Sequence, residues 1–463
     1  MPPAPSSIDA LLAQARRECL SEVEREELLL EDNDDFSRPL NPRNEAAALD
    51  RLYARGGGAG DDKAALDALA ISYVQRTGGP ARAGETQQQA PEVDADTAAL
   101  AEWALRESAS VSIAALAPAL FVDPSNTAPA RRGLAATRDL QPGDIALQLD
   151  AQKLAITYRT ARESDLGRAL SALGLEDESL ALLWTMADRH DPESPHAPFW
   201  RALQTPEQQQ EQQKNQPPDH LGTPLGAGVS DAAVERALGG TPLGDRCREA
   251  RRHLQAAWEG SVAPAAEALV RAYPQHLRAE WFTRDRFLWA AELWYAYAMQ
   301  LALPQGKRAK GGVKEEEEED PVPALVPLAS LANHGAWPHC VAFSDCRSGK
   351  QRLRVFRPVR EGDELLISYG PYDNGELLLF YGFSIPANPF DARAVRRQLR
   401  EGGGDGKDAA GPWRAAHAAA LARVKRALGE EERGSGWTEA ERAFFRSARV
   451  WLRGFLAAEA ALA

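Results

Sequence analysis

The stretch of sequence that decides the fold runs from residue 327 to residue 383 and contains three short boxes. They read PLASLANH at residues 327–334, EGDELLISYG at residues 361–370, and NGELLLFYGF at residues 374–383. Each box joins a short apolar run to Asn, Gly or Tyr, and glycine is typical of the points where strands end and turns begin. Any one box alone is a weak signal, whereas the three boxes in this order are specific.

A β-hairpin is predicted around the second box. Residues 352–358 alternate apolar and polar side chains with the period of a strand, residues 360–363 have turn chemistry, and residues 364–369 form a second short strand. Tyr369 ends that second strand and is followed by Gly370, so we expect its phenol at a loop rim, where it can touch a ligand. The alternative is that Tyr369 is only a half-buried aromatic residue at a strand end.

The three boxes resemble those of the SET-domain protein lysine methyltransferases, in the branch typified by the Rubisco large-subunit methyltransferase. That branch carries a Pro-Leu-x-Asp-x-x-Asn-His box, then a Tyr-Gly box, then a Tyr-Gly-Phe. The resemblance covers residues 97–391. It implies an α+β fold with a β-rich SET domain, a helical insertion, and helical N- and C-terminal regions. It also implies a pseudoknot in which the Asn-His segment threads beside the Tyr-Gly loop, although most topologies avoid threading.

The resemblance implies roles for individual residues, with S-adenosyl-L-methionine as the cofactor. Asn333 matches the residue that binds the methionine part of the cofactor, and the backbone of the residue matching His334 meets the adenine. Tyr369 matches the catalytic tyrosine that contacts the cofactor and orients the donor methyl and the substrate amine. Tyr381 matches a second tyrosine, which lines the substrate channel.

A fourth match begins at residue 131. Residues 131–139 resemble the family's Gly-Leu-Val-Ala box, and this implies cofactor contacts from Arg131, Arg132 and Gly133, partly through the backbone. On the residues alone, the segment is a turn into a strand in which Gly133 allows a close backbone approach. Ala130 stands where plant members often have glutamate, so that position offers no carboxylate.

Two positions assigned to the substrate channel depart from the family pattern. On a helix predicted over residues 284–303, Tyr297 stands where the family has an arginine that holds the cofactor and channel. Ser330 replaces the usual aspartate three residues before Asn333. Both changes remove charge from the site. They are compatible with a different substrate side chain, with weaker cofactor binding, or with a domain that has stopped catalysing.

The chemistry of methyl transfer explains why the boxes contain these residue types. Transfer from a sulfonium to an amine is an in-line displacement, so catalysis consists mostly of aligning three atoms in a narrow, dry channel. A lysine amine with an ordinary pKa near ~10.4 must first lose its proton, and desolvation beside a positive sulfonium lowers that pKa. No strong protein base is required, which is consistent with the absence of a Ser/His/Asp or paired-carboxylate signature.

Composition restricts the partners. The 463 residues suggest two or three domains, and the net charge of −13 argues against nucleic acid and favours a basic partner surface. The four cysteines, Cys19, Cys247, Cys340 and Cys346, form no close-spaced pair, so neither a disulfide framework nor a zinc site is signalled. His339 with Cys340 and Cys346 lacks a fourth ligand, and we expect no metal.

The patterns divide the chain into three regions. Residues 1–93 are a helical appendage with a flexible linker, residues 94–391 are the SET domain with a helical insertion at about 160–300, and residues 392–463 resemble a shortened substrate-binding helical domain. An alternative for residues 392–463 is that they form only a structural cap. The acidic start shows no targeting signal, and we expect the cytoplasm or nucleus, with the plastid as an open alternative.

Several elements are predicted from periodicity. Leu100, Trp103 and Ala104 face inward on a helix over residues 94–108, and Ile145, Leu147 and Leu149 alternate on a strand. The apolar run at 287–304 contains Glu292 and is short for a membrane span, so we expect a buried helix. Further helices are predicted at residues 7–31, 44–55, 62–76, 413–428 and 438–460, and a disordered Gln-rich loop at 206–218.

The leading hypothesis is a lysine N-methyltransferase that acts on a protein other than a histone tail. Histidine methylation, which some members of this branch perform, is an alternative within the same chemistry. A non-catalytic SET module that binds protein partners is the alternative from another class, motivated by Tyr297 and Ser330. We expect a monomer whose partner is a protein substrate that presents a lysine side chain, with neither nucleic acid nor membrane as partner.

Overall fold

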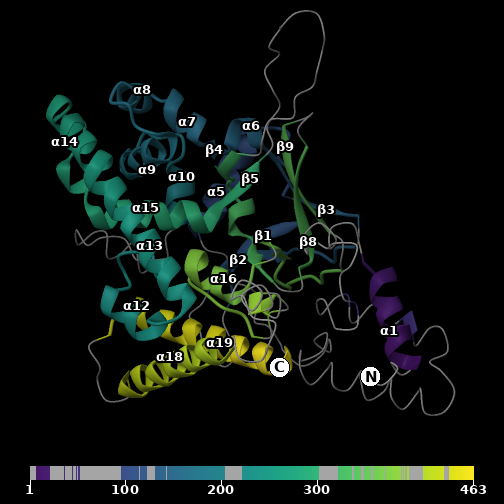
Figure 1. The fold of residues 1–463 in the computed structure, drawn as a ribbon. Helices are drawn as coiled ribbons and strands as arrows, with labels where there is room; N and C mark the ends of the chain where they lie inside the picture. Colours follow the sequence, from purple (N-terminus) through teal and green to yellow (C-terminus); the bar gives the residue numbers. More distant parts are fainter. Residues whose placement is uncertain are drawn as a thin grey trace, which may run out of the picture.

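In a computed structural model, the described part of the chain combines long helices with three small sheets, which confirms the α+β class (Figure 1). Two predicted features, the helix at 62–76 and the Gln-rich loop at 206–218, lie outside the described residues. The structure describes residues 7–20, 36, 44, 48, 51–52, 95–113, 115–121, 131–141, 143–203, 222–301, 322–335, 338–345, 349–355, 358–370, 372–386, 388, 390–391, 394–395, 410–431 and 437–462.

The central sheet has five strands in the order β3-β9-β8-β10-β7. The strands are β3 (Ile145–Asp150), β7 (Asn333–His334), β8 (Cys340–Asp345), β9 (Lys350–Val355) and β10 (Leu366–Ile367). Strand β10 runs parallel to both β7 and β8 and lies between them, although both precede it in the chain. This insertion places the Asn-His segment beside the chain that leads into the Tyr-Gly box, as the resemblance implied.

The strand pairing predicted between residues 352–358 and 364–369 is wrong. Strand β9 pairs antiparallel with β8 on one side and with β3 on the other, so both of its edges are occupied. The turn itself is present, since the amide of Asp363 donates to the carbonyl of Arg360 at 3.1 Å. Alternation of side chains predicts that a strand exists and which face is buried, but it does not select the partner strand.

Strand β3 also differs from its predicted pattern. Leu147 and Leu149 are buried as expected, but Ile145 is 39% exposed and Ala146 is buried in its place. The pairing of β3 with β9 shifts by one residue between Ile145 and Leu147. A β-bulge of this kind reverses which side chains face the core, because side chains alternate strictly along a strand.

Two smaller sheets flank the central one. The first pairs β1 (Leu116–Phe121) with β2 (Arg131–Ala136) in antiparallel fashion. The second has the order β4-β6-β5, made of β4 (Ile156–Thr157), β5 (Ala298–Leu301) and β6 (Val322–Leu325). An isolated bridge between Ala135 and Glu364 joins β2 to the second sequence box.

Helices surround the sheets, and many belong to the segment between β4 and β5. Leu100, Trp103 and Ala104 are buried on α5, which confirms the predicted inward face. Among the described residues up to 272, the helices are α1 (Ser7–Glu18), α5 (Ala95–Glu107), α6 (Ala151–Leu154), α7 (Tyr158–Glu163), α8 (Asp165–Ser171), α9 (Asp177–Asp188), α10 (Ala197–Ala202), α12 (Asp231–Leu238), α13 (Pro242–Ala257), the π-helix η1 (Trp258–Val262) and α14 (Ala263–Ala272).

Helix α15 (Arg284–Tyr297) is the buried helix expected from the apolar run, but it ends earlier than predicted. Its side chains from Phe287 to Trp294 are buried, including Glu292, whose carboxylate accepts a hydrogen bond of 2.6 Å from the Thr223 hydroxyl. After Tyr297 the chain becomes β5, because its backbone pairs with β6. Within the described part of the chain, no helix has the length and apolar content needed to cross a membrane.

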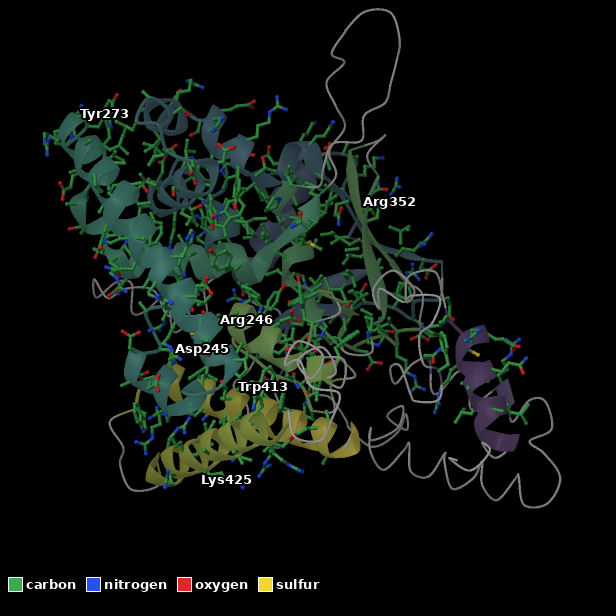
Figure 2. All side chains as sticks on the ribbon, viewed as in Figure 1. Asp245, Arg246, Tyr273, Arg352, Trp413 and Lys425 are labelled. Atoms are coloured by element: carbon green, nitrogen blue, oxygen red, sulfur yellow. The ribbon has the colours of Figure 1, made fainter. Side chains whose placement is uncertain are left out.

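The C-terminal region is a pair of long helices, α18 (Ala410–Glu431) and α19 (Glu439–Leu462), close to the predicted ranges. They lie side by side against α12 and α16 (Asn374–Tyr381), as Figure 1 shows. Lys425 of α18, labelled at the lower edge of the molecule in Figure 2, and Asp245 of α13 are both exposed. The N-terminal helix is described only as α1, where Leu12 and Ala15 are buried, and the rest of the predicted helix at 7–31 lies largely outside the described residues.

Candidate active site

Asn333, His334 and Tyr369 come together where β7 and β10 lie side by side. Leu366 pairs with Asn333, and Ile367 pairs with His334, so Tyr369 follows two residues beyond the strand. The backbone amide of Tyr369 donates to Nδ1 of His334 at 3.1 Å, and the Tyr369 hydroxyl donates to the carbonyl of Ala332 at 3.1 Å. The phenol is therefore held next to the Asn-His segment, as predicted.

The side-chain amide of Asn333 has a fixed orientation. Its Nδ2 donates to the carbonyl of Arg132 at 2.7 Å and to Oε1 of the buried Glu364 at 2.8 Å. Both amide hydrogens are thus used, and no described residue donates to Oδ1 of Asn333. Because an amide carries its donor and acceptor on opposite sides, Glu364 and Arg132 together leave Oδ1 as an open hydrogen-bond acceptor.

Gly133 lies against this pair and confirms the predicted close backbone approach. A Cβ atom at Gly133 would lie 2.7 Å from Oε1 of Glu364, 3.0 Å from Nδ2 of Asn333 and 3.0 Å from the ring of Phe121. These separations are shorter than normal van der Waals contact. Only glycine therefore allows β2 to pass this close to Asn333 and Glu364.

We expect Gly133→Ala to displace the pair and to lower the free energy of unfolding by about 1–3 kcal/mol, which is typical of overpacking. The measurement is thermal unfolding, followed by the affinity for S-adenosyl-L-methionine, which should fall with it. Gly429→Ala on α18 is the matched control, since a Cβ there has no neighbour within 4 Å. Equal stability and affinity in Gly133→Ala and the parent would contradict this description.

The other two predicted residues of β2 are placed differently. The guanidinium of Arg132 donates to the carbonyl of Ala202 at the end of α10, and its charge acts on the phenol of Tyr297. For Arg131 the structure describes only the backbone, which pairs with Phe121. The structure thus brings Arg132 and Gly133 to Asn333, while a cofactor contact by Arg131 stays a prediction.

Aromatic rings form one wall of the site. The ring centroid of Tyr369 lies 4.9 Å from that of Tyr381 and 5.3 Å from that of His334. Tyr381 in turn lies 5.9 Å from Tyr372 and 6.2 Å from Phe383. The left-handed C-cap Gly382 (φ 76°) ends α16 and turns the chain so that Phe383 returns to the cluster. Tyr372 and Phe383 received no role from sequence reasoning, although Phe383 stood in the Tyr-Gly-Phe box.

The phenols of this wall remain neutral at physiological pH. Burial raises the pKa of Tyr369, and the neighbouring Tyr297 and Glu364 raise it further. Burial also raises the pKa of Tyr381, with Tyr372 and Tyr369 adding to the effect, and burial raises the pKa of Tyr297. These hydroxyls can therefore donate and accept hydrogen bonds, but they do not act as ionised bases.

His334 is a buried, neutral imidazole. Burial lowers its pKa from 6.5 to about 4. Since Nδ1 accepts the Tyr369 amide hydrogen, the ring proton is assigned to Nε2, which is buried without a hydrogen-bond partner among the described residues. His334 thus has a buried donor without a partner among the described residues, one residue away from the open acceptor of Asn333.

We expect the ring of His334 to titrate near pH 4 when followed by NMR of its nitrogens. Between pH 6.5 and about 4, the unfolded chain binds a proton at this residue and the folded chain does not. The contribution of the neutral ring to the free energy of unfolding is therefore fully present above pH 6.5. It is lost as the pH falls toward 4, and the free energy of unfolding decreases by roughly 3 kcal/mol in all. A titration midpoint above pH 6 would contradict the burial and the tautomer.

Tyr297 and Ser330, the two departures from the family pattern, contact each other. The hydroxyl of Ser330 donates to the backbone carbonyl of Tyr297 at 3.1 Å and accepts from the amide of Val326 at 3.1 Å. It ties the end of α15 to the 3₁₀ turn η3 (Ala329–Leu331) that precedes Asn333. The phenol of Tyr297 is near enough to influence Tyr369. Contact of Tyr297, Ser330 or Tyr381 with a substrate stays a prediction.

His339 takes part in the same sheet connection. Its Nδ1 accepts from the amide of Leu366 at 3.1 Å, and its own amide donates to the carbonyl of Leu366 at 2.8 Å. Cys346 lies outside the described residues, and in the described part of the chain no group of three His, Cys, Asp or Glu side chains is arranged to hold a metal ion. The imidazole of His339 therefore serves to fix β10.

The family model described as the SET domain matches residues 131–370, which is more than half of the chain. The matched region begins at β2 with Arg131 and ends at Gly370, directly after Tyr369, so it contains the whole of the Asn333, His334 and Tyr369 cluster. This chain belongs to the SET-domain family.

Two proteins named as lysine methyltransferases are among its relatives. Ribosomal lysine N-methyltransferase set10 of Schizosaccharomyces pombe is 31% identical over 118 residues, 25% of this chain and 20% of that protein. N-lysine methyltransferase SETD6 of Rattus norvegicus is 26% identical over 301 residues, 64% of this chain and 55% of that protein. The chain thus spans about a fifth to about half of the length of these curated relatives.

A solved structure of Rubisco LSMT bound to sinefungin and monomethyllysine is also similar to the chain. It has a TM-score of 0.46 and 16% sequence identity, and the match covers 80% of this chain and 93% of that one.

Proposed function

We propose that this protein is an S-adenosyl-L-methionine-dependent lysine N-methyltransferase that acts on a protein other than a histone. The observation that carries the proposal is the convergence of Asn333, His334 and Tyr369, which two separate sequence boxes supply through the β7–β10 pair. Membership in the SET-domain family and the names of the two relatives support it.

The open hydrogen-bonding atoms of the site fit the cofactor. Oδ1 of Asn333 is an acceptor suited to the ammonium of the methionine part, and Nε2 of His334 is a donor for a ligand acceptor. The guanidinium of Arg132, which extends from the strand next to Asn333, suits the methionine carboxylate. When bound, S-adenosyl-L-methionine supplies an electrophilic methyl group.

The aromatic wall suits a lysine side chain. The rings of Tyr369, Tyr381 and Phe383 offer apolar faces to the methylene chain and attract a cation when the amine is charged. Burial among these rings lowers the pKa of a lysine amine and so favours the neutral nucleophile. The phenolic oxygen of Tyr369, held by the Ala332 carbonyl, can then orient that amine.

The partner under this proposal is a protein, and nucleic acid is not a partner. The formal net charge of −13 at pH 7 repels a phosphate backbone and favours a substrate segment with basic side chains. Incubation of the 463-residue chain with labelled RNA or DNA at low salt should give no complex, whereas a complex resistant to competition by polyanions would contradict this point.

The experiment is a labelling of cell extract with the purified chain and a cofactor that carries a tagged transferable group. Mass spectrometry of the labelled proteins should find the tag on lysine. Extract incubated with the tagged cofactor but without the purified chain serves as the blank for background labelling. A tag on histidine would favour the alternative substrate side chain, and labelling no greater than the blank would favour a SET module without catalysis.

A further inference from the structure

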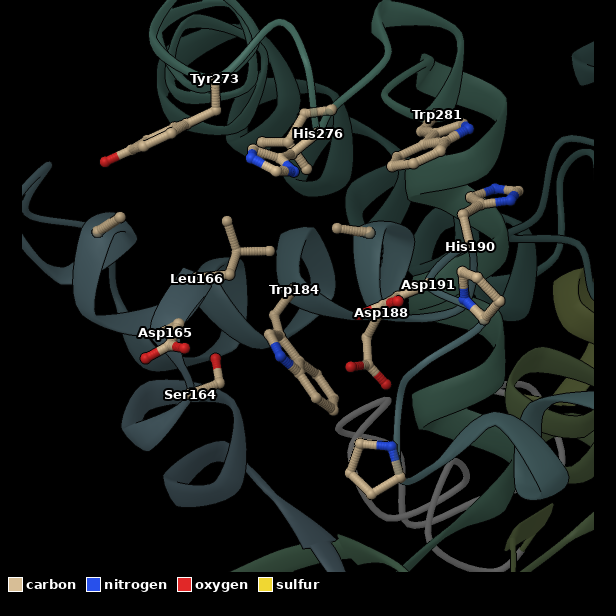
Figure 3. Close-up of a pocket in the computed structure, with 15 residues that line it drawn as sticks. Ser164, Asp165, Leu166, Trp184, Asp188, His190, Asp191, Tyr273, His276 and Trp281 are labelled. Atoms are coloured by element: carbon tan, nitrogen blue, oxygen red, sulfur yellow. The ribbon is translucent and has the colours of Figure 1, made fainter.

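A second site lies within the helical insertion. A cavity of about 660 Å³, here called the insertion cavity, opens between α8, α9 and the following turn on one side and residues 273–281 on the other (Figure 3). The second side comprises the chain after α14 and the 3₁₀ turn η2 (Ala279–Trp281). Volumes of this order are typical of sites that hold small ligands or peptide side chains.

The insertion cavity is separate from the candidate active site. Helix α15 connects the two, since Arg286 near its start contacts the cavity residue His190 and Tyr297 at its end lies near Tyr369. Eleven residues of helix separate these ends, which corresponds to roughly 16 Å at a rise of 1.5 Å per residue. Figure 2 places Tyr273, another cavity residue, at the outer end of α14.

Two tryptophans form its apolar walls. Trp184 of α9 is buried and packs edge-on against Trp200, and Trp281 stacks on His190 with centroids 5.1 Å apart. The guanidinium of Arg278, which does not line the cavity, lies 6.0 Å from the centroid of the Trp281 ring. Indole faces are the strongest aromatic partners for a cation.

The charge of the cavity lining is negative. Asp165, Asp188 and Asp191 line it, and neither lysine nor arginine does. Asp165 is paired with Arg168, and Asp191 accepts the amide hydrogen of Glu193 at 2.9 Å. Burial and the nearby arginines lower the pKa of His190 to about 3, so this lining residue carries no positive charge.

Asp188 is the less exposed of the two cavity carboxylates, Asp188 and Asp191, that form no ion pair with arginine or lysine in the described part of the chain. Its side chain is 12% exposed, and its Oδ2 accepts from Ser194 Oγ at 2.8 Å and from Trp200 Nε1 at 2.7 Å, with Nδ1 of His196 at 3.3 Å. No described residue donates to its Oδ1. The carboxylate is thus held rigidly through one oxygen, while the other remains open. Figure 3 shows it beside Trp184, across the cavity from His276 and Trp281.

We propose that the insertion cavity binds an arginine side chain presented by a protein segment. The guanidinium donates to Oδ1 of Asp188, and its planar face lies against the indole of Trp281 or Trp184. Arginine fits better than lysine because its planar group stacks on aromatic rings and is more weakly hydrated. The volume exceeds that needed for one side chain, which favours a segment over a free amino acid.

The test measures the binding of two short capped peptides, Gly-Arg-Gly and its citrulline analogue, to the 463-residue chain in the absence of cofactor. NMR of the indole Nε1 signals should show shifts of Trp184 and Trp281 with the arginine peptide. We expect the neutral citrulline peptide and free arginine each to bind at least about tenfold more weakly than the arginine peptide. Equal binding of the arginine and citrulline peptides would overturn the proposal, and equal binding of free arginine would overturn the assignment to a protein segment.

A variant pair locates the interaction. Asp188→Asn keeps an oxygen for Ser194 and Trp200 but removes the charge. We expect this variant to bind the arginine peptide about tenfold more weakly or weaker still. Asp177→Asn is the matched control on the same helix, because Asp177 is exposed and pairs with Arg162 outside the cavity. Unchanged affinity in a folded Asp188→Asn variant, or an equal loss in Asp177→Asn, would overturn the proposal.

Discussion

We expect Tyr369→Phe to lower the rate of methyl transfer by about 10²–10³-fold, an order of magnitude taken from the removal of one preorganised hydrogen-bonding group from an active site. The substitution removes the hydroxyl that donates to the Ala332 carbonyl and keeps the ring that packs 4.9 Å from Tyr381. Alignment of the amine is then lost while the aromatic wall is preserved. Cofactor affinity should change little, because the lost hydroxyl orients the substrate amine for transfer and the cofactor binds mainly through other residues.

The measurement is single-turnover transfer of a labelled methyl group to the substrate identified from extract. Tyr295→Phe is the matched control, since it removes a phenol hydroxyl that donates to Glu178 at 3.0 Å in the insertion. That control should transfer methyl at the parental rate. A folded Tyr369→Phe variant that also retains the parental rate would remove Tyr369 from the catalytic machinery.

We expect Asn333→Ala to weaken cofactor binding by about 10–100-fold, from the value of one hydrogen bond to a charged group. The substitution removes the open acceptor Oδ1. It also leaves Oε1 of Glu364 and the carbonyl of Arg132 without the amide that now donates to them. The variant therefore loses the hydrogen bond to the cofactor and also the two hydrogen bonds that hold Glu364 and Arg132 in place.

Equilibrium dialysis with labelled S-adenosyl-L-methionine measures this change. Gln148→Ala on β3 is the control, because it also removes a side-chain amide that donates to a backbone carbonyl, that of Ser110 at 2.8 Å, away from Asn333. Parental affinity in Asn333→Ala would show that the cofactor binds without this residue, whereas an equal loss in both variants would indicate general destabilisation.

The resemblance predicted that Tyr369 lies beside the Asn333–His334 segment, because the two boxes match family motifs whose threading is known. Periodicity alone would have failed here. It assigned residues 364–369 to a hairpin with residues 352–358, whereas β10 pairs with β7 and β8. Partner choice depends on which strand edges are free after the whole sheet forms, and the local pattern contains no such information.

Long apolar helices were predicted better than their ends. The buried face of α5 and the two C-terminal helices follow from side-chain spacing, but α15 stops at Tyr297 because β6 offers its backbone a strand partner. Glu364 received no role from the sequence, since nothing in its spacing shows that its carboxylate accepts from Asn333. The insertion cavity was likewise invisible, because its walls come from segments about 90 residues apart that only packing brings together.

Calorimetric titration of the parent chain with S-adenosyl-L-methionine tests the central claim most directly. We expect one saturable site per chain and a rise in the unfolding temperature as the ligand concentration increases. We also expect Asn333→Ala to abolish most of this heat. A folded chain that gives neither heat nor a thermal shift at millimolar cofactor would contradict the account, because the open atoms of Asn333 and His334 would then serve no S-adenosyl-L-methionine.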